Sequence, residues 1–312
     1  MTGTTPIDTI IQGDALTRLK ELPSESADCC ITSPPYFGLR DYGVEGQIGL
    51  EESPEAYVSK LVDVFREVRR VLKKEGTLWL NLGDSFASGK GTCFNPGGGS
   101  SSLGKARKDA GAHPLNRGNI SDLRASGLKP KDLIGIPWMV AFALRADGWY
   151  LRSDIIWHKP NCMPESVTDR PTKSHEYIFL LSKSQKYYYD GEAIKEESIT
   201  NDPRKPYTSQ GAKELDGRDV WHSGEKRENG DFTKRNKRTV WTVATKPYSE
   251  AHFATFPEKL IEPCVLAGCP EGGICLDPFF GAGTTGLVAK KLGRHFVGIE
   301  LNEAYIGMAQ KR

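Results

Sequence analysis

Residues 281–286 read Gly-Ala-Gly-Thr-Thr-Gly, a glycine-rich loop that follows the apolar run Gly273–Leu276. The run predicts a buried strand, and the residues Thr285–Leu292 predict a helix. The loop is therefore expected where α/β proteins bind nucleotide-type cofactors. Such a loop normally opens its domain, but here only residues 287–312 follow it. Most of the sheet must come from sequence that precedes the loop.

The pattern Gly281-x-Gly283-x-x-Gly286 matches the dinucleotide fingerprint, and Glu300 follows at the distance expected of a ribose-binding carboxylate. Two features favour S-adenosylmethionine over NAD. Asp277 ends the strand, where a carboxylate repels a pyrophosphate but suits the ammonium group of S-adenosylmethionine. No second βαβ half follows Glu300, although the sheets of dinucleotide enzymes place one there. Glu300 itself suits the ribose hydroxyls of either cofactor.

Residues 33–36 read Ser-Pro-Pro-Tyr and follow a second buried apolar run, Ala27–Thr32, which places them at the carboxyl edge of the sheet. The two prolines remove two N–H groups and leave the carbonyls of Ser33 and Pro34 free as acceptors. These acceptors and the Ser33 hydroxyl suit an exocyclic amino group, whose nitrogen they draw toward a more nucleophilic, tetrahedral state. Tyr36 offers a flat face for an extruded base. Without a histidine partner, Ser33 is expected to form hydrogen bonds and not to act as a general base.

Strand and helix signals alternate along the chain, which predicts an α/β fold with a mostly parallel, Rossmann-like sheet and helices on both faces. The helix over 54–72 has a clear signal, because its apolar residues recur at three- and four-residue steps. The expected strands are 7–11, 27–32, 77–82, 149–158, 175–183, 273–276 and 295–300, and the expected helices are 15–19, 54–72, 133–146, 257–268 and 285–292. The strand that ends at Leu276 should lie close to the strand that ends at Thr32.

The composition is that of an ordinary globular protein. The 312 residues are 38% hydrophobic and carry a formal net charge of +2, so overall charge does not indicate a nucleic-acid partner. No apolar run reaches the length of a membrane span and the N-terminus lacks a signal-peptide pattern, which predicts a cytoplasmic protein. The seven cysteines are scattered without a CxxC pair. They are interpreted as reduced thiols that hold no metal.

Two polar segments carry concentrated charge. Residues 88–131 hold eight basic and two acidic side chains around a Gly/Ser run at 97–102. They predict a flexible basic loop, either a solvated linker or an arm that contacts phosphate. Residues 193–238 hold 11 basic and 9 acidic side chains with interspersed aromatics. A segment of this length is either a surface loop or a recognition element, and the coincidence of charge with aromatics favours recognition. The expected DNA-binding residues are Lys234, Arg235, Lys237 and Arg238.

With these motifs, nearly the whole chain resembles the amino-methylating DNA methyltransferases in the permuted arrangement called the β class. Residues 32–42 (Thr-Ser-Pro-Pro-Tyr-Phe-Gly-Leu-Arg-Asp-Tyr) are similar to the catalytic motif, and residues 277–285 (Asp-Pro-Phe-Phe-Gly-Ala-Gly-Thr-Thr) to the S-adenosylmethionine motif. The shorter matches are 297–300 to the ribose-binding segment, 13–16 to the motif at the cofactor adenine, 254–261 to the motif at the methionine end, and 154–160 to the segment near the target base.

The resemblance implies an enzyme that transfers a methyl group from S-adenosylmethionine to the amino group of a base flipped out of double-stranded DNA. It implies that Ser33, Pro34, Pro35 and Tyr36 hold this base. Family members with serine at the first motif position mostly methylate N4 of cytosine, and those with aspartate mostly N6 of adenine, so cytosine is favoured and adenine stays open. The implied cofactor residues are Asp14, Phe256, Pro257, Asp277, Phe279, Gly281, Gly283, Thr284 and Glu300.

The same resemblance divides the domain into a catalytic half over 1–192, a target-recognition insert over 193–241 and a cofactor-binding half over 242–312. It is compatible with a homodimer and with a cognate restriction endonuclease as a partner. Two other functions are still open at this point, an NAD-dependent oxidoreductase and a DNA-binding regulator without catalysis. The intact Ser33–Tyr36 turn argues against the regulator, since a non-catalytic protein has no need of that geometry.

Overall fold

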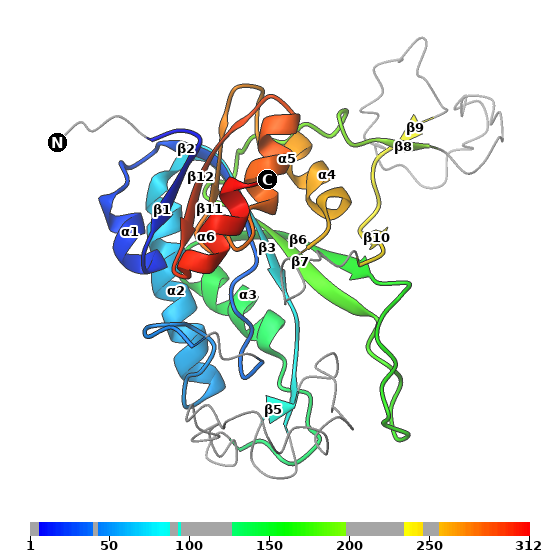
Figure 1. Ribbon diagram of the computed structural model, residues 1–312. Helices are drawn as coiled ribbons and strands as arrows, with labels where there is room; N and C mark the ends of the chain where they lie inside the picture. The colour runs from blue at the N-terminus through cyan, green and yellow to red at the C-terminus, as the bar shows by residue number, and fades with distance from the viewer. Residues whose placement is uncertain (1–5, 40–42, 88–92, 95–126, 198–233, 246–255) are drawn as a thin grey trace, which may run out of the picture.

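An eight-stranded sheet forms the centre of the protein (Figure 1). The structure is a computed structural model that describes residues 6–39, 43–87, 93–94, 127–197, 234–245 and 256–312. Across the sheet the strands are β1 (Thr9–Gln12), β12 (His295–Glu300), β11 (Ile274–Asp277), β2 (Ala27–Thr32), β3 (Leu72–Leu82), β7 (His175–Ser182), β6 (Tyr150–His158) and β10 (Val240–Thr242). The strands from β1 to β3 are parallel, whereas β7 is antiparallel to both β3 and β6. The mostly parallel sheet expected from the sequence is confirmed.

The two strands that carry the motifs are neighbours, which confirms the spatial prediction. β11 pairs with β2 in parallel, with Cys275 opposite Cys29. Because both strands run in one direction, their carboxyl ends lie at the same edge of the sheet. The loop after Asp277 and the turn after Thr32 therefore begin side by side. β7 runs the other way, so its first residues lie at this edge as well.

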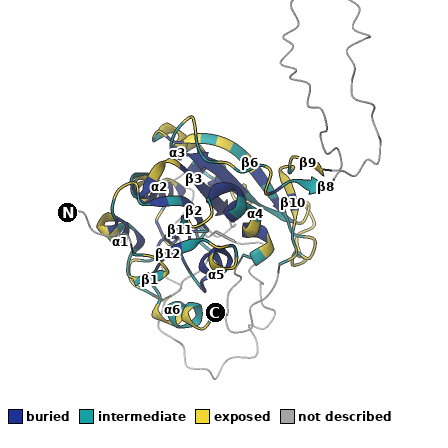
Figure 2. Cartoon of the chain, turned by 90° about the horizontal axis from the view of Figure 1, so that it is seen from above, coloured by how far each residue is buried: buried dark blue, intermediate teal, exposed yellow. Residues whose placement is uncertain are grey.

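Helices cover both faces of the sheet, and alternate strand residues enter two hydrophobic clusters. In β3, Leu78 and Leu80 belong to one cluster and Trp79 to the other. The first cluster includes α1 (Ala15–Glu21), α2 (Pro54–Val71) and α3 (Ile136–Ala146), and the second includes α4 (Glu258–Gly268) and α5 (Thr284–Lys291). Figure 2 shows the buried strands between these helical layers. The last helix, α6 (Glu303–Gln310), lies beside β1 and β12.

Where elements differ from expectation, the causes are local. α3 begins at Ile136 and not at residue 133, because Gly135 takes a left-handed conformation and a proline follows in the first turn. β3 begins before the expected residue 77, because Leu72 already pairs with Ala27 of β2. α6 is not among the expected helices. It spans 8 residues and none of them is buried, and such a segment is shorter than the roughly 11–18 residues over which helical periodicity is read.

Two segments singled out in the sequence lie largely outside the described residues. The basic loop over 88–131 is described only at 93–94 and 127–131, and the insert over 193–241 only at 193–197 and 234–241. In the first segment β5 (Cys93–Phe94) pairs with β4 (Phe86–Ala87), which precedes the segment, and in the second β8 (Glu196–Glu197) pairs with β9 (Lys234–Arg235); both pairs are antiparallel. In the described part of the chain, no helix is both long and apolar enough to cross a membrane.

Candidate active site

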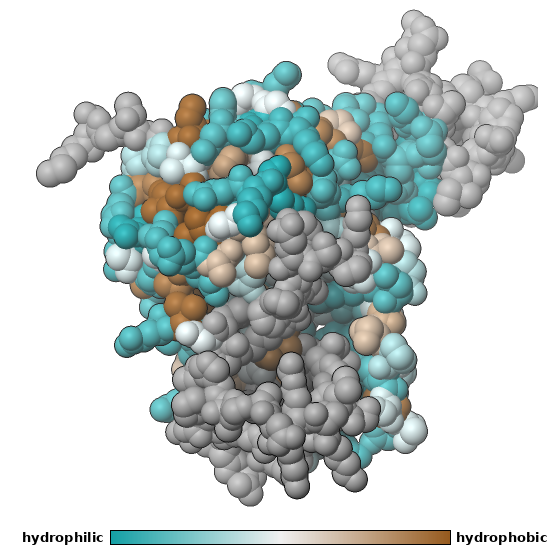
Figure 3. All heavy atoms as spheres, in the orientation of Figure 1, coloured by the Kyte–Doolittle hydropathy of each residue, from teal (hydrophilic) through white to brown (hydrophobic). Residues whose placement is uncertain are grey.

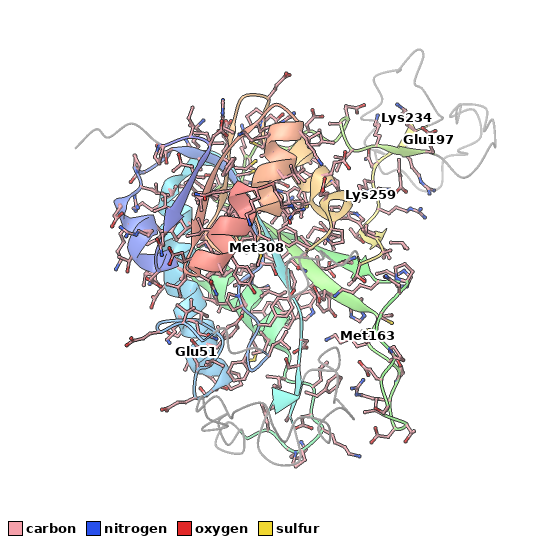
Figure 4. The ribbon with its side chains drawn as sticks, viewed as in Figure 1. Glu51, Met163, Glu197, Lys234, Lys259 and Met308 are labelled. Atoms are coloured by element: carbon pink, nitrogen blue, oxygen red, sulfur yellow. The ribbon has the colours of Figure 1, made fainter. Side chains whose placement is uncertain are left out.

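A cavity of about 440 Å³ lies at the edge of the sheet where the parallel strands end. Its wall includes the connection between β6 and β7, on which Met163 is labelled in Figure 4. The fold brings the turn and the glycine-rich loop to this one cavity, although 245 residues separate Thr32 from Asp277. The sequence-predicted residues in the wall are Asp14, Ser33, Pro34, Pro35, Tyr36, Phe256, Phe279, Gly281, Thr284 and Glu300.

Glu300 holds the start of the glycine-rich loop in place. Its Oε2 accepts a hydrogen bond from Gly281 N at 2.7 Å, and its Oε1 accepts one from Asn302 N at 2.8 Å. Burial raises the pKa of Glu300, and these two backbone hydrogen bonds act in the opposite direction. A carboxylate that accepts one bond on each oxygen has further lone pairs. Glu300 can therefore accept from a pair of ligand hydroxyls in the cavity.

One position between β11 and α5 requires glycine. Gly283 has a φ of +79°, and a Cβ added there would come within 2.8 Å of the Ala309 Cβ in α6. Gly283 itself is not in the cavity wall, whereas Thr284, the first residue of α5, is. The close approach of α6 thus restricts the position of the glycine-rich loop on the side that faces away from the cavity. The first N–H groups of α5 have no partner within the helix, so they can donate to a ligand.

Asp277 connects the two motifs from beneath the cavity. Its Oδ1 accepts from Thr32 Oγ1 at 2.6 Å and from Phe279 N at 3.1 Å, and its Oδ2 accepts from Thr285 Oγ1 at 2.6 Å. Burial raises the pKa of Asp277 to about 7, although these hydrogen bonds favour the charged form. The side chain is buried and is not part of the wall. It ties the strand that precedes Ser33 to the helix that follows the loop.

Asp14 and Phe256 enter the wall from two other elements. Asp14 caps α1, where its Oδ1 accepts from Thr17 N at 2.9 Å and from Thr17 Oγ1 at 2.8 Å. Phe256 precedes α4, and Pro257, the N-cap residue of that helix, lies outside the wall. On the side of the glycine-rich loop, the cavity wall therefore combines the carboxylates of Asp14 and Glu300 with the rings of Phe256 and Phe279.

The Ser33–Tyr36 turn presents an unused carbonyl to the cavity. The Pro35 carbonyl accepts a hydrogen bond from Tyr57 Oη at 2.8 Å. Among the described residues, no hydrogen bond reaches the carbonyl of Pro34, which lies in the wall. An amino group placed here can donate to this carbonyl and to Ser33 Oγ at the same time. Ser33 and Pro34, the acceptor pair expected from the sequence, thus both lie in the cavity wall.

The hydroxyl of Tyr36 links Ser33 to a carboxylate. Ser33 Oγ donates to Tyr36 Oη at 3.4 Å, and Tyr36 Oη donates to Glu176 Oε2 at 2.8 Å. Asn81 borders both groups, since its Oδ1 lies 3.1 Å from Tyr36 Oη and its Nδ2 donates to Glu176 Oε2 at 3.2 Å. Burial, followed by the charge of Glu176, raises the pKa of the Tyr36 phenol well above its usual value. The phenol therefore keeps its proton at rest.

Glu176 also pairs with a cation. Lys159 Nζ donates to Glu176 Oε1 and lies 4.2 Å from the centre of the Trp157 ring, and all three residues line the cavity. Neither Glu176 nor Asn81 is among the site residues expected from the sequence. For Asn81 the signal is a polar side chain inside the apolar end of β3, and for Glu176 it is a carboxylate at the start of the apolar strand β7. For Glu176 the direction of β7 is also needed, because only an antiparallel β7 brings its start to this edge.

The basic residues over 234–238 lie outside the cavity wall. Arg235 Nε and Arg238 Nε both donate to Glu196 Oε1, at 2.9 and 2.5 Å. These hydrogen bonds, and not burial, are the reason that the pKa of Glu196 is lowered. One carboxylate therefore serves two of the four cations, so the charge that the cluster can offer to a polyanion is smaller than the sequence indicates.

Lys234 and Lys237 have no carboxylate partner within the described part of the chain. Lys234 is exposed. It lies opposite Glu197 in the backbone pairing of β8 with β9 (Figure 4). Lys237 Nζ lies 5.1 Å from the centre of the Trp241 ring. The surface around the antiparallel pair of β8 and β9, called the β8–β9 hairpin below, is hydrophilic (Figure 3).

The two sides of the cavity differ in chemistry. The side of the glycine-rich loop presents carboxylates, aromatic rings and helix N–H groups, which suit the hydroxyls, the adenine and the positive charge of S-adenosylmethionine. The side of the Ser33–Tyr36 turn presents a hydroxyl, a carbonyl and an aromatic ring, which suit a planar base that carries an amino group. A single cavity can thus hold a methyl donor and a base in contact with each other.

Residues 27–311 match a family described as DNA methylase, of the N6/N4 type. The chain is 51% identical over 306 residues to the type II methyltransferase M.SmaI of Serratia marcescens, an alignment that covers 97% of this chain and 89% of that protein. It is 49% identical over 304 residues to the type II methyltransferase M.Cfr9I of Citrobacter freundii, covering 97% of this chain and 87% of that protein.

Solved structures share the fold at lower identity. The chain is similar to the PvuII DNA methyltransferase, a cytosine-N4-specific enzyme, with a TM-score of 0.63 and 17% identity over 98% of this chain and 86% of that one. It is also similar to TTHA0409 of Thermus thermophilus in complex with S-adenosyl-L-methionine, with a TM-score of 0.56 and 24% identity over 97% of this chain and 93% of that one. These likenesses confirm the α/β architecture.

Proposed function

The chain belongs to the DNA methylase family of the N6/N4 type, and we propose that it methylates the N4 amino group of cytosine in double-stranded DNA. Members of this family are DNA methyltransferases that use S-adenosylmethionine. Membership therefore removes the NAD-dependent oxidoreductase and the non-catalytic regulator. The order of turn before loop places the chain, in this proposal, in the permuted β class. The observation that carries the proposal is the position of Ser33 and Pro34 in the same cavity as the glycine-rich loop.

Two features support cytosine over adenine. The first motif position holds Ser33, a hydroxyl, where adenine-specific members of the family mostly hold a carboxylate. Cytosine also carries a carbonyl oxygen two ring positions from its amino group, where adenine carries a C–H. Lys159 is a donor in the cavity wall that suits such a carbonyl. Adenine is the second candidate, because the Pro34 carbonyl can accept from the amino group of either base.

The glycine-rich side of the cavity would hold the cofactor. Glu300 is positioned to accept from the ribose hydroxyls, and Asp14 is assigned to the adenine end. Phe256 is assigned to the methionine end, and Asp277 acts through the shape of the loop, since its oxygens already accept three hydrogen bonds. When bound, S-adenosylmethionine supplies an electrophilic methyl group.

The turn would bind the base and remove a proton from it. Ser33 Oγ and the Pro34 carbonyl accept from the target amino group, and the ring of Tyr36 stacks on the base. The amino nitrogen that has accepted a methyl group carries one proton too many. Ser33 Oγ takes this proton while passing its own to Tyr36 Oη, and Tyr36 passes its proton to Glu176 Oε2. Atoms and charge balance, because Glu176 ends protonated and the base neutral.

The direct test identifies the product. Purified protein, tritiated S-adenosylmethionine and double-stranded DNA of mixed sequence are incubated, and the DNA is digested to nucleosides for mass spectrometry. N4-methylcytosine is expected. N6-methyladenine would overturn the choice of cytosine while keeping the enzyme class, and no label in any DNA would overturn the proposed function. Protein boiled before the reaction supplies the background.

A second prediction concerns Gly83, which leaves room for the Tyr36 ring. A Cβ added at Gly83 would come within 2.5 Å of Tyr36 Cε2. Gly83→Ala is therefore expected to displace the ring and to reduce kcat/KM roughly 10²-fold, the scale reported for small misplacements of reacting groups. Steady-state methylation assays measure the effect, and circular dichroism checks folding. Gly307→Ala is the control, because a Cβ there meets no atom within 4 Å. Equal losses in both variants would show that the position of Tyr36 is not the cause.

A third prediction concerns DNA contact by the β8–β9 hairpin. If Lys234 and Lys237 each neutralise one phosphate, the double variant Lys234→Ala/Lys237→Ala should reduce the slope of log K against log salt by about 2. Fluorescence anisotropy with a labelled duplex at several salt concentrations measures this slope. Lys20→Ala/Lys74→Ala removes the same charge from another part of the surface and should leave the slope unchanged. A slope in the hairpin variant equal to that of the unmodified protein would remove the hairpin from the DNA interface.

The relatives are type II methyltransferases, so the proposal includes a cognate restriction endonuclease as a partner. A homodimer is a separate part of the proposal. Neither partner is needed for the chemistry described above, because one chain supplies every residue assigned to it.

A further inference from the structure

Three buried cysteines meet in the core on the side of the sheet covered by α4. Cys29 of β2 and Cys275 of β11 face each other on neighbouring strands, with their Sγ atoms 3.5 Å apart. Cys269, which ends α4, joins them, and the three Sγ atoms lie within 4.8 Å of one another. None of the three lines the active-site cavity. Their spacing in the sequence shows no metal motif, since only the fold brings them together.

The cluster has the size of a metal–thiolate site. An equilateral triangle of sulfur atoms about 4 Å apart has its centre about 2.3 Å from each corner, which is the length of a zinc–thiolate bond. Within the described part of the chain, no histidine, carboxylate or further thiol belongs to this group. All three cysteines are fully buried, so the site lies in the protein core. The cluster offers three sulfur ligands and no fourth one.

We propose that Cys29, Cys269 and Cys275 form a binding site for one trivalent arsenic, taken up as neutral arsenous acid. Zinc sites that stabilise protein folds use four ligands, and this cluster has three. Three thiolates around a monovalent or divalent cation carry a net negative charge, which is costly in a buried site. Trivalent arsenic forms three bonds and gives an uncharged tris-thiolate, so both its valence and its charge fit.

The reaction is a condensation without a change of oxidation state. Three As–S bonds form and three As–O bonds break. Each hydroxide leaves as water with the proton of one of the three thiols. A surface depression of about 270 Å³ is lined by Asp28 and Pro270, the chain neighbours of Cys29 and Cys269, and offers an approach for a small neutral reactant.

The full chain is reduced with a phosphine and incubated anaerobically with sodium arsenite. Native mass spectrometry and arsenic X-ray absorption are then expected to show one arsenic per chain with three sulfur neighbours. The melting temperature is expected to rise, because a ligand held only by the folded state stabilises it. In a parallel arm, zinc chloride should bind at least tenfold more weakly. Two sulfur neighbours, or tighter binding of zinc, would overturn the proposal.

Matched cysteine variants locate the site. Cys275→Ser is expected to weaken arsenite binding at least tenfold. Cys264→Ser is the control, because Cys264 is equally buried in α4 but its Sγ contacts the Leu260 carbonyl at 3.7 Å and is not part of the cluster. Equal affinity of both variants for arsenite would overturn the assignment of the site to the three cysteines. If Cys275→Ser does not fold, the sulfur count in the unmodified protein decides.

Discussion

Replacing Glu176 by glutamine is expected to lower kcat by about 10²–10⁴-fold with little change in KM for DNA, the range for loss of a general base. In the proposed mechanism Glu176 receives the proton that passes through Ser33 Oγ and Tyr36 Oη, and its Oε2 lies 2.8 Å from Tyr36 Oη. Glutamine keeps one acceptor oxygen in place of the two that bind Tyr36 and Lys159, and its amide cannot hold the extra proton. Single-turnover methylation with labelled cofactor measures the rate directly.

Two comparisons separate proton transfer from a structural role. Tyr36→Phe keeps the ring and removes the hydroxyl, so the double variant with Glu176→Gln should be no slower than the slower single one. Asp169→Asn removes an exposed carboxylate from the same connection and should be neutral. A kcat unchanged by Glu176→Gln would exclude Glu176 from the relay.

Replacing Asp277 by asparagine is expected to flatten the pH dependence of the free energy of unfolding. Burial raises the pKa of Asp277 from 3.8 to about 7, so over this range the folded protein holds a proton that the unfolded chain has released. The stability contributed by this carboxyl is complete below the unfolded pKa. It is lost as the pH rises through about 7, at roughly 1 kcal/mol per pH unit. Asparagine is neutral at every pH and removes this slope.

Urea unfolding at several pH values measures the effect. Asparagine can keep the hydrogen bonds, because the Thr285 hydroxyl lies 3.4 Å from the Ile31 carbonyl and can turn to it while accepting from the new amide. Asp277→Ala instead leaves the Thr32 hydroxyl unpaired, whereas Thr285 can still turn to the Ile31 carbonyl, and should cost about 1–3 kcal/mol. Asp63→Asn, at an exposed ion pair, is the control. Parallel plots of the free energy of unfolding against pH for the unmodified protein and Asp277→Asn would contradict a raised pKa of Asp277.

Part of the architecture can be predicted from local sequence. The strands at 27–32 and 295–300 have the same bounds in the sequence prediction and in the structure. Each is a short apolar run between polar or turn residues, so its length and burial depend on neighbours in the chain. The pairing of β11 with β2 also follows, because a cofactor loop and a base-binding turn can act together only if their strands end side by side.

Other parts of the site depend on strand order and direction. Glu176 reaches the cavity because β7 runs antiparallel to β3, and a parallel β7 would place it at the opposite edge. The thiols of Cys29 and Cys275 meet because the register pairs these two residues, whereas a shift of one residue would turn one of them to the other face. Single positions in the sequence contain neither kind of information.

The sequence by itself determined every helix except α6, most of the strands and the two motifs, because apolar periodicity, prolines and glycines act on residues close in the chain. Only the tertiary structure decided which polar groups work together. Tyr36 and Glu176 are 140 residues apart in the chain, and hydrogen bonds form only at contact distance. The partners of the catalytic turn therefore depend on the packing of the whole sheet.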